Sequence, residues 1–595
     1  MSTSPARRRS GPPTHRWRTV LARAVLTASL PAVFTACSVL PGSAPEAPST
    51  PGTGTGDGTL PPVAVTEPAQ TPDPVVPEDF RQEAAGIVAD LSDEELAGSV
   101  VMATYAGTDG AAAADLVTDL HLAGVIVMGT NLPAGAGPAD VHAIVQEIGR
   151  GTSAEAAADV PVLVGVDEEG GPVARLDGAG PVVPPLLVHG AAADPQVSTA
   201  VTRAQGAGLR DLGFTLDFAP VADVTIGAAD PTINVRSAGS DPETVAEVVA
   251  GAVTGYGAAG IASSAKHFPG HGALDTDSHL ALPESDRTIA EMANTDLPPF
   301  EAAVEAGVSS VMMGHIDLPG GGALPASLDP EAYAELRERL GPEVGSGTSS
   351  DSTGGDRTGY EGVVVTDALN MGAVTQSAGS TDAALQAIAA GADLALMPSD
   401  TAASVAAIEA ALDSGDLPRD RLVEASERVM ALRLWQADAA ATAREDAEGS
   451  DGTEAALDTA LADLGAAALT VAAGPCRVED TGAGIPGSVE VEGASATDVE
   501  VFATAAEDAG LEVVEGGGDL RVAIDGTDGD VLVSTQAPWD ATALVDAAGD
   551  DIPVLFTYDD YAQGLAAAAD WVAGEATAPG RLPVEVDGLD PPDCG

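Results

Sequence analysis

Residues 362–371, Gly-Val-Val-Val-Thr-Asp-Ala-Leu-Asn-Met, form a short apolar run that polar residues follow at once. Residues 261–272, Ile-Ala-Ser-Ser-Ala-Lys-His-Phe-Pro-Gly-His-Gly, have the same arrangement. A short run rich in β-branched and small residues, bounded by polar residues and glycines, is typical of a strand buried on both faces. Each stretch therefore predicts a buried strand with reactive side chains at its carboxyl end.

Eight runs of this kind alternate with alanine-rich helical patterns from residue 95 onward. Buried strands joined by helices imply a parallel sheet covered on both faces, and eight such units predict a closed barrel. The expected strands are Val100–Tyr105, Gly124–Met128, Val162–Asp167, Thr215–Val221, Ile261–His267, Val308–His315, Gly362–Asp367 and Ala392–Met397. The expected helices are Ala139–Arg150, Pro195–Leu212, Pro242–Tyr256, Pro298–Ala306, Pro330–Leu340, Thr381–Ala390, Ala402–Leu412 and Arg421–Leu434.

The fold class that follows is α/β, a (β/α)₈ TIM-type barrel followed by a smaller α/β C-terminal domain. The barrel is expected over residues 80–440, a linker over 441–455 and the second domain over 456–595. Gly345–Thr358, rich in Gly, Ser, Thr and Asp, indicates a surface insertion. The second domain's expected strands are Ala467–Val471, Val499–Val501, Leu511–Val514, Leu520–Ile524, Val531–Ser534 and Val554–Thr557.

The N-terminus has the features of an export signal. Six arginines precede a mostly apolar stretch, Ala24–Ala36, which is too short to span a bilayer. Residues 1–36 are therefore expected to be a signal peptide. Phe34-Thr35-Ala36-Cys37 resembles a bacterial lipobox, in which Cys37 carries the lipid; the alternative is an ordinary signal peptide with an incidental cysteine. Residues 37–79, rich in Pro, Thr, Gly and Ser, predict a lipid-anchored tether, so the protein is expected on the outer face of the membrane or secreted.

Charge and cysteine content narrow the choice of function. The 595 residues include 25 basic and 91 acidic side chains, a net charge of −66, which excludes unaided binding to nucleic acid or to an anionic membrane surface. Such acidity also keeps a protein soluble. Of the basic residues only Lys266 is a lysine. Cys476 and Cys594 are expected to form a disulfide, because export places them in an oxidising compartment.

Polar residues collect after four of the predicted strands. In a (β/α)₈ barrel the carboxyl ends of the strands form the active site. The residues at these ends are Asp167–Gly171 with Arg175, Lys266–Gly272 with Asp277–His279, Gly314-His315, and Thr366–Met371.

Three chemistries were weighed for this set. Metal hydrolysis could use His267, His271 and His279, but Pro269 and nearby glycines disfavour the helix that a zinc site of this spacing needs. Phosphate-ester chemistry lacks a glycine-rich loop with its lysine. Glycoside hydrolysis fits best, because it needs a rigid carboxylate and a proton donor. No metal and no cofactor are expected. A strand-end Asp such as Asp367 also serves as a helix cap, so this alternative stays open.

Taken together, these motifs resemble the β-N-acetylglucosaminidase (NagZ-type) branch of glycoside hydrolase family 3. The resemblance covers about residues 85–440, with weaker traces to 586. It rests on the motifs Lys266–Gly272, Asp277-Ser278-His279, Asp167–Gly171 with Arg175, Asn234–Ser237, Thr366–Met371 and Ala578–Pro583.

The resemblance implies a role for each matched residue. Asp367 would be the nucleophile, His279 the general acid/base, and Asp277 the carboxylate that orients His279. The residues that would bind the sugar hydroxyls are Asp167, Arg175, Arg236, Lys266 and His267. His271 is expected to shape the loop. The sequence departs from the family pattern at Glu168, Pro172, Ala238 and Ala368, where Gln, Arg, an aromatic residue and Asp are usual.

The function implied is a retaining, exo-acting β-N-acetylglucosaminidase that removes terminal β-linked GlcNAc from cell-wall muropeptides or chitin-type oligosaccharides. Alternatives within the family are a phosphorylase, because neutral imidazole does not repel phosphate, and a β-glucosidase or β-xylosidase. A sugar-binding lipoprotein without catalysis is the alternative from another class.

Overall fold

The computed structural model describes residues 76–322, 324–341, 359–377, 382–447, 452–482, 484–549, 551–589, 591–592 and 594. The predicted signal peptide, Cys37 and all but the last residues of the predicted tether lie outside these ranges. The predicted insertion at 345–358 lies outside them as well. No helix of the described part is long and apolar enough to cross a membrane.

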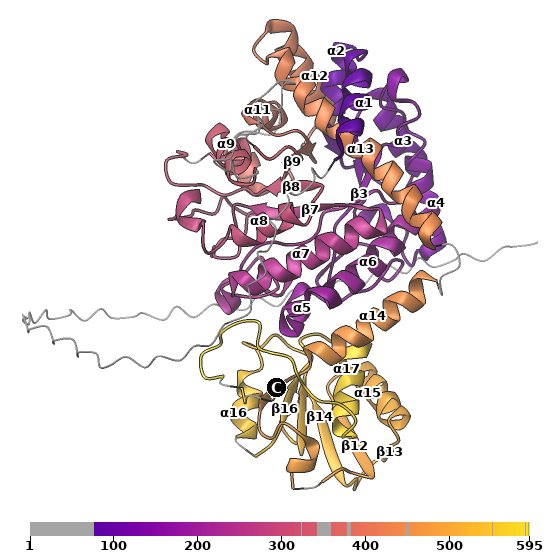
Figure 1. The fold of residues 1–595 in the computed structure, drawn as a ribbon, viewed down its shortest axis with the longest axis vertical. Helices are drawn as coiled ribbons and strands as arrows, with labels where there is room; N and C mark the ends of the chain where they lie inside the picture. The colour runs from indigo at the N-terminus through magenta and orange to yellow at the C-terminus, as the bar shows by residue number, and fades with distance from the viewer. Residues whose placement is uncertain are drawn as a thin grey trace, which may run out of the picture. The chain divides into compact units, whose positions relative to one another are not determined.

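The barrel sheet contains eight parallel strands, one in each stretch that the sequence predicted (Figure 1). Their spatial order is β10-β1-β2-β3-β6-β7-β8-β9. A parallel bridge between Val365 and Leu394 joins the two outer strands, so the barrel is nearly closed. The strands are β1 Val101–Ala103, β2 Gly124–Ile126, β3 Leu163–Val166, β6 Leu216–Asp217, β7 Ala262–Phe268, β8 Ser310–Met313, β9 Val363–Thr366 and β10 Ala395–Leu396.

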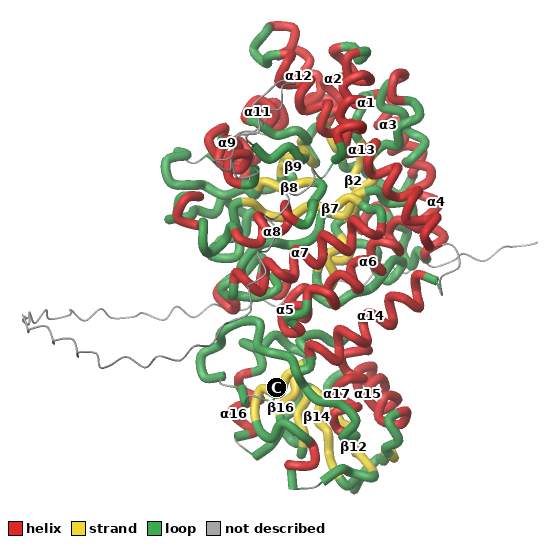
Figure 2. Tube along the Cα trace, in the orientation of Figure 1, coloured by secondary structure: helices red, strands yellow, loops and turns green. Residues whose placement is uncertain are grey.

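Helices surround this sheet, with the strands at the centre (Figure 2). Three of them begin at an Asp-Pro pair, because the Asp side chain accepts hydrogen bonds from first-turn N–H groups and proline suits the first helical position. The helices are α1 Glu78–Ala89, α2 Asp93–Ser99, α3 Gly110–Asp119, α4 Pro138–Ile148, α5 Leu186–Ala192, α6 Pro195–Leu212, α7 Pro242–Ala259, α8 Pro298–Glu305, α9 Pro330–Arg339, α10 Gly372–Ser377, α11 Ala383–Ala390, α12 Thr401–Ser414 and α13 Arg419–Ala447.

The second domain is built on a separate six-stranded sheet of order β11-β16-β15-β14-β12-β13, in which only β11 and β16 pair antiparallel. Its strands are β11 Thr470–Ala473, β12 Ser488–Gly493, β13 Glu512–Val513, β14 Leu520–Ile524, β15 Val531–Ser534 and β16 Val554–Phe556. Its helices are α14 Thr453–Ala468, α15 Ala496–Asp508, α16 Thr542–Ala548 and α17 Ala562–Val572. Cys476 and Cys594 form a disulfide.

The structure differs from the sequence-based picture of this part of the chain in three places. Residues 499–501 lie inside α15, because the Ser495 hydroxyl caps a helix there. The strand β12 was missed, although its sequence alternates serine, valine and glutamate. The linker expected over 441–455 is helical at both ends, since the Ala-, Arg- and Glu-rich composition extends α13 to Ala447 and α14 begins at Thr453.

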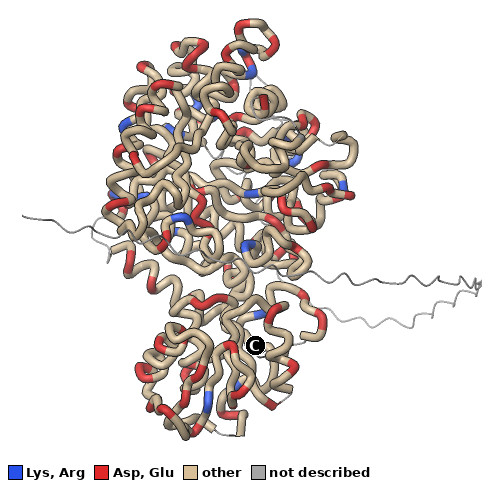
Figure 3. Tube along the Cα trace, turned by 180° about the vertical axis from the view of Figure 1, so that it is seen from behind, with Lys and Arg blue, Asp and Glu red and all other residues tan. Residues whose placement is uncertain are grey.

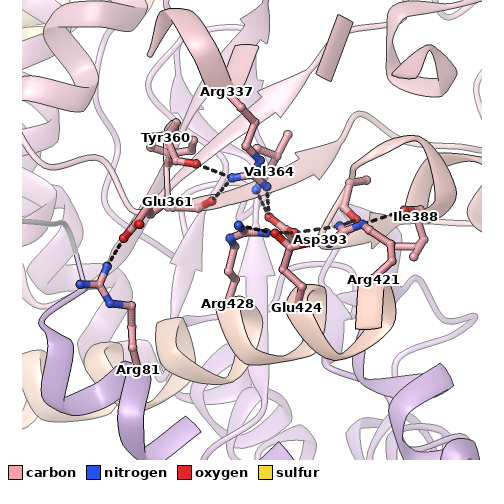
Figure 4. Close-up of polar contacts among 12 residues, drawn as sticks. Arg81, Arg337, Tyr360, Glu361, Val364, Ile388, Asp393, Arg421, Glu424 and Arg428 are labelled. Carbon is pink, nitrogen blue, oxygen red and sulfur yellow. Dashed lines mark hydrogen bonds and ion pairs between the residues drawn. The ribbon is translucent and has the colours of Figure 1, made fainter. Parts of the chain in front are cut away.

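A buried ion cluster fastens the barrel where β9 meets β10 (Figure 4). The Asp393 carboxylate is fully buried and pairs with Arg337, Arg421 and Arg428, which come from α9 and α13. It also accepts the Val364 N–H at 2.9 Å. Burial alone would raise the pKa of Asp393, but the three guanidinium groups lower it to about 2. The cluster therefore stabilises closure as a fully charged unit.

Acidic residues are spread over both the barrel and the second domain, and basic residues are few among them (Figure 3). The net charge of −66 is therefore a property of the whole described surface rather than of one acidic segment.

We predict that Asp393→Asn lowers the free energy of unfolding by about 3–5 kcal/mol, because three partly buried guanidinium groups lose the buried carboxylate on which they converge. Urea unfolding at pH 7 measures this loss. Because the pKa of Asp393 is lowered from 3.8 to about 2, its contribution is present above pH 3.8 and disappears as pH falls toward 2.

The matched control is Arg419→Ala, which removes an exposed ion pair with Asp93. It should cost under about 1 kcal/mol. Equal losses in the two variants would contradict the role given to Asp393.

Candidate active site

The chemistry-bearing residues lie at one end of the barrel. Asp167 follows β3, Lys266 and His267 lie in the last part of β7, His315 follows β8, and Asp367 follows β9. Since all eight strands are parallel, their carboxyl ends meet on the same side of the sheet.

Glu169 is the centre of the ion pairs at this end. Its carboxylate accepts two hydrogen bonds from the Arg236 guanidinium, at 2.8 and 2.9 Å, and lies 2.7 Å from the Lys266 Nζ. The same Nζ donates to Asp167 Oδ1 at 2.9 Å. Burial raises the pKa of Glu169, but Arg236 and Lys266 outweigh it, so the pKa is lowered and the group stays charged.

Sequence reasoning named Lys266, Arg236 and Asp167 as sugar ligands and did not single out Glu169. The structure brings the three predicted residues together, and it shows that Glu169 holds the two cations. The available signal was the position of Glu169 in the Asp167–Gly171 run, two residues after a strand-end carboxylate.

A second missed residue, Asp223, holds the stretch that follows β7. Its buried carboxylate accepts hydrogen bonds from Nδ1 of His267 at 2.7 Å, from the His267 N–H at 3.2 Å and from the His271 N–H at 2.7 Å. The bond at Nδ1 fixes the His267 ring and leaves Nε2 for another partner. Asp223 follows the short β6 strand, and this strand end was not searched for polar residues.

His271 is buried, and neither of its ring nitrogens has a hydrogen-bond partner among the described residues. Burial lowers its pKa. The loop-shaping role expected for His271 stays a prediction. The described part of the chain contains no group of three His, Cys, Asp or Glu side chains arranged to hold a metal ion.

His279 and Asp277 form an exposed carboxylate–imidazole pair. Nδ1 of His279 donates to Asp277 Oδ1 at 2.8 Å, and the side chains are 62% and 34% exposed. Burial raises the pKa of Asp277, but hydrogen bonds from His279 outweigh it and lower the pKa. The His279 carbonyl accepts the Gly372 N–H at 3.2 Å, which ties this pair to the segment that follows Asp367.

Asp367 lies directly after β9, and one of its oxygens accepts the Ala368 N–H at 2.7 Å. Burial raises its pKa, but His315, His267, the Ala368 N–H and Lys266 together lower it to about 2. Asp367 is therefore a carboxylate throughout the neutral range.

His315 is hydrogen-bonded to the segment that contains Asp367. Its Nε2–H donates to the Ala368 carbonyl at 3.0 Å, and its Nδ1 lies 2.7 Å from the Ser327 hydroxyl. The ring is fully buried, and this burial lowers its pKa. The ring is therefore neutral, and its Nδ1 accepts a hydrogen bond from the Ser327 hydroxyl. The sequence predicted His315 at a strand end but gave it no role. In the structure its ring contacts the carbonyl of Ala368, the residue that follows Asp367.

Arg175 and Glu168 share the hairpin formed by β4 Glu168–Gly170 and β5 Val173–Ala174. Glu168 Oε2 accepts the Arg175 and Leu176 N–H groups at 2.7 and 3.2 Å. Nε of Arg175 is buried without a hydrogen-bond partner among the described residues. Arg175 is therefore available to a ligand. Burial raises the pKa of Glu168 to about 7.

The neighbouring Glu168 and Glu169 should respond to pH in opposite ways. Between pH 4.5 and about 7, Glu168 is protonated in the folded state and ionised in the unfolded state. The free energy of unfolding therefore falls as pH rises through this range. We predict that Glu168→Gln gains about 2–4 kcal/mol of unfolding free energy, relative to the natural chain, between pH 4 and pH 8.

Glu169→Gln is the matched control with the opposite sign. It should lose about 3–5 kcal/mol at pH 7, because Arg236 loses its ion pair and Lys266 loses one of its two, and this loss should shrink as pH falls below 4.5. Denaturant unfolding at several pH values measures both effects. Parallel curves for the two variants would refute this assignment.

The comparisons with known proteins agree with this geometry. Beta-hexosaminidase LpqI of Mycobacterium tuberculosis is 32% identical over 394 residues, which cover 64% of this chain and 92% of that protein. The solved structure of a glycoside hydrolase family 3 beta-N-acetylglucosaminidase from Paenibacillus sp. is 27% identical, with a TM-score of 0.66, and covers 83% of this chain and 99% of that one. A solved beta-glucoside phosphorylase, BglX, has a TM-score of 0.65 at 18% identity, over 85% of this chain and 96% of that one, which shows a common fold alone.

The glycosyl hydrolase family 3 N terminal domain matches residues 93–432, a range that contains every barrel strand and every residue of the site described above. The chain therefore belongs to glycosyl hydrolase family 3 and is a glycoside hydrolase.

Proposed function

We propose that the chain is a retaining, exo-acting β-N-acetylglucosaminidase. The observation that carries the proposal is the exposed Asp277–His279 pair, whose backbone is hydrogen-bonded to the segment after Asp367. A proton-transfer group and a permanently ionised carboxylate thus stand on neighbouring loops, which is the pairing that glycoside hydrolysis needs.

In the first step Asp367 attacks the anomeric carbon, and the bond from that carbon to the leaving oxygen breaks. His279 donates its Nε2 proton to that oxygen, so the aglycone departs as a neutral alcohol. In the second step His279 takes a proton from water, and the water oxygen displaces Asp367. Two displacements at one carbon restore its original configuration. Asp277 keeps Nδ1 protonated and stabilises the imidazolium.

The buried cluster would bind the terminal sugar. Asp167, Lys266 and His267 Nε2 would accept or donate hydrogen bonds to hydroxyls, and Arg175 and Arg236 would add charge-assisted donors. The relatives named beta-hexosaminidase and beta-N-acetylglucosaminidase support an N-acetylhexosamine at this position.

We further propose that the chain is exported and held at the outer face of the membrane by a lipid on Cys37. A Cys37→Ala chain that remained in the membrane fraction after signal cleavage would contradict this.

Release of p-nitrophenol from the β-GlcNAc glycoside by residues 80–595, with the β-glucoside as comparison, tests the activity. We predict a preference for the GlcNAc glycoside, no turnover by Asp367→Ala, and a loss of about 10²–10⁴-fold for His279→Ala. Product analysis in phosphate buffer distinguishes hydrolysis from phosphorolysis, which would give the sugar 1-phosphate.

The orienting role of Asp277 has a matched control two residues earlier in the same loop. Asp277→Asn should lower kcat and shift the pH profile, whereas Asp275→Asn, at an exposed side chain that accepts a hydrogen bond from Thr276, should change neither. Turnover of neither glycoside by the natural chain would reject the proposed function.

A further inference from the structure

Large exposed apolar side chains are rare on the described surface. Four stand out: Val182, Ile226, Leu280 and Ile485, exposed by 64%, 49%, 72% and 57%. Val182 lies between β5 and α5, Ile226 and Leu280 lie on the loops that follow the barrel strands β6 and β7, and Ile485 belongs to the second domain. In a chain with 91 acidic residues, apolar side chains left exposed on loops after barrel strands indicate a surface that contacts something apolar.

Leu280 and Ile226 are both tied to the loop that carries the acid/base pair. Leu280 directly follows His279, and its carbonyl accepts the Gln376 Nε2–H at 2.8 Å. The Ile226 N–H donates to the Gly272 carbonyl at 3.0 Å, so Ile226 is fastened to the start of the same loop. Hydrogen bonds thus hold Ile226 at the start of the loop that carries His279, and Leu280 at the end of it.

The proposed reaction requires the aglycone to bind close to Leu280. A proton donor must come within about 3 Å of the leaving oxygen, and the aglycone is bonded to that oxygen. Consecutive Cα atoms are about 3.8 Å apart, so the residue after His279 lies within reach of the first aglycone unit. Leu280, which is 72% exposed, offers that unit an apolar side chain without charge.

Charges around the mouth disfavour an anionic aglycone. Residues 271–282 contain Asp275 and Asp277 and neither Lys nor Arg. Lys266 and Arg236 are paired with Glu169, and the proposed function assigns Arg175 to the terminal sugar. A carboxylate on the aglycone would therefore meet negative charge near at hand and a net charge of −66 on the whole chain.

We propose that Leu280 and Ile226 form an apolar aglycone subsite, which selects a neutral N-acetylhexosamine, as in chitin-type oligosaccharides, over a sugar that bears a lactyl carboxylate and a peptide. The proposal rests on the proposed function and names the substrate class of the same site. The apolar side chains contact the pyranose face and the acetamido methyl group, and the loop of residues 271–282 supplies no Lys or Arg to pair with a carboxylate.

The test compares kcat/KM for N,N′-diacetylchitobiose and for the GlcNAc–MurNAc disaccharide, with and without its peptide, at 20 mM and 500 mM salt. We expect the natural chain to prefer chitobiose at low salt, and the preference to shrink at high salt as the repulsion is screened. Preference for the carboxylate-bearing substrate at low salt would overturn the proposal.

Variants at the exposed side chains localise the effect. Leu280→Ser and Ile226→Ser should each lower kcat/KM for chitobiose about three- to tenfold, mainly through KM, because each variant buries fewer apolar carbons against the bound sugar. Leu280→Lys should raise kcat/KM for the anionic disaccharide. The control Ile485→Ser, equally exposed but in the second domain, should change none of these values.

Two further outcomes separate the claims. If Leu280→Ser behaves like Ile485→Ser while the natural chain hydrolyses the aryl β-GlcNAc glycoside, the subsite is refuted and the proposed function stands. If the aryl glycoside is not hydrolysed either, the proposed function itself fails. Since Leu280 is largely exposed, unchanged thermal unfolding should verify that its variants fold.

Discussion

The buried carboxylate of Glu169 organises the active-site end of the barrel. It joins Lys266, on β7, to Arg236, on the loop after β6, and it belongs to the hairpin after β3. Three separate segments thus depend on one group. Burying these ions is costly, and the cost is offset only because each charge has a close partner of opposite sign. The geometry also explains why residue 266 is a lysine. Its compact ammonium contacts both Asp167 and Glu169, and a planar guanidinium has a different shape.

Two carboxylate–imidazole pairs divide the work of the site. The Asp223–His267 pair is buried, so its ring is held in one orientation. The Asp277–His279 pair is exposed to solvent. Under the proposed function, the same two functional groups would give a rigid sugar-binding residue in the buried setting and a proton-transfer residue in the exposed one.

Much of the barrel could be predicted from the sequence, because continuous apolar runs of β-favouring residues mark strands buried on both faces. The strand-end rule also located Asp167, Lys266, His267 and Asp367. It could not identify Glu169 or Asp223, since their importance lies in pairing with residues about 50 to 100 positions away, and one sequence contains no trace of such pairs. Residues 499–501 show a similar limit, because a stretch as short as Val-Glu-Val suits a strand and a helix equally, and the Ser495 cap decides for the helix.

The central claim is that Asp367 forms a covalent bond to the sugar, which is bound by the residues that Glu169 positions. Mass spectrometry of the protein, treated with a 5-fluoro β-GlcNAc donor that slows the second step, tests this most directly. The account predicts one added glycosyl unit, located on the peptide that contains Asp367, and no adduct in Asp367→Ala. A glycosyl unit on another residue, or turnover of the donor with inversion and no adduct at any time, would contradict it.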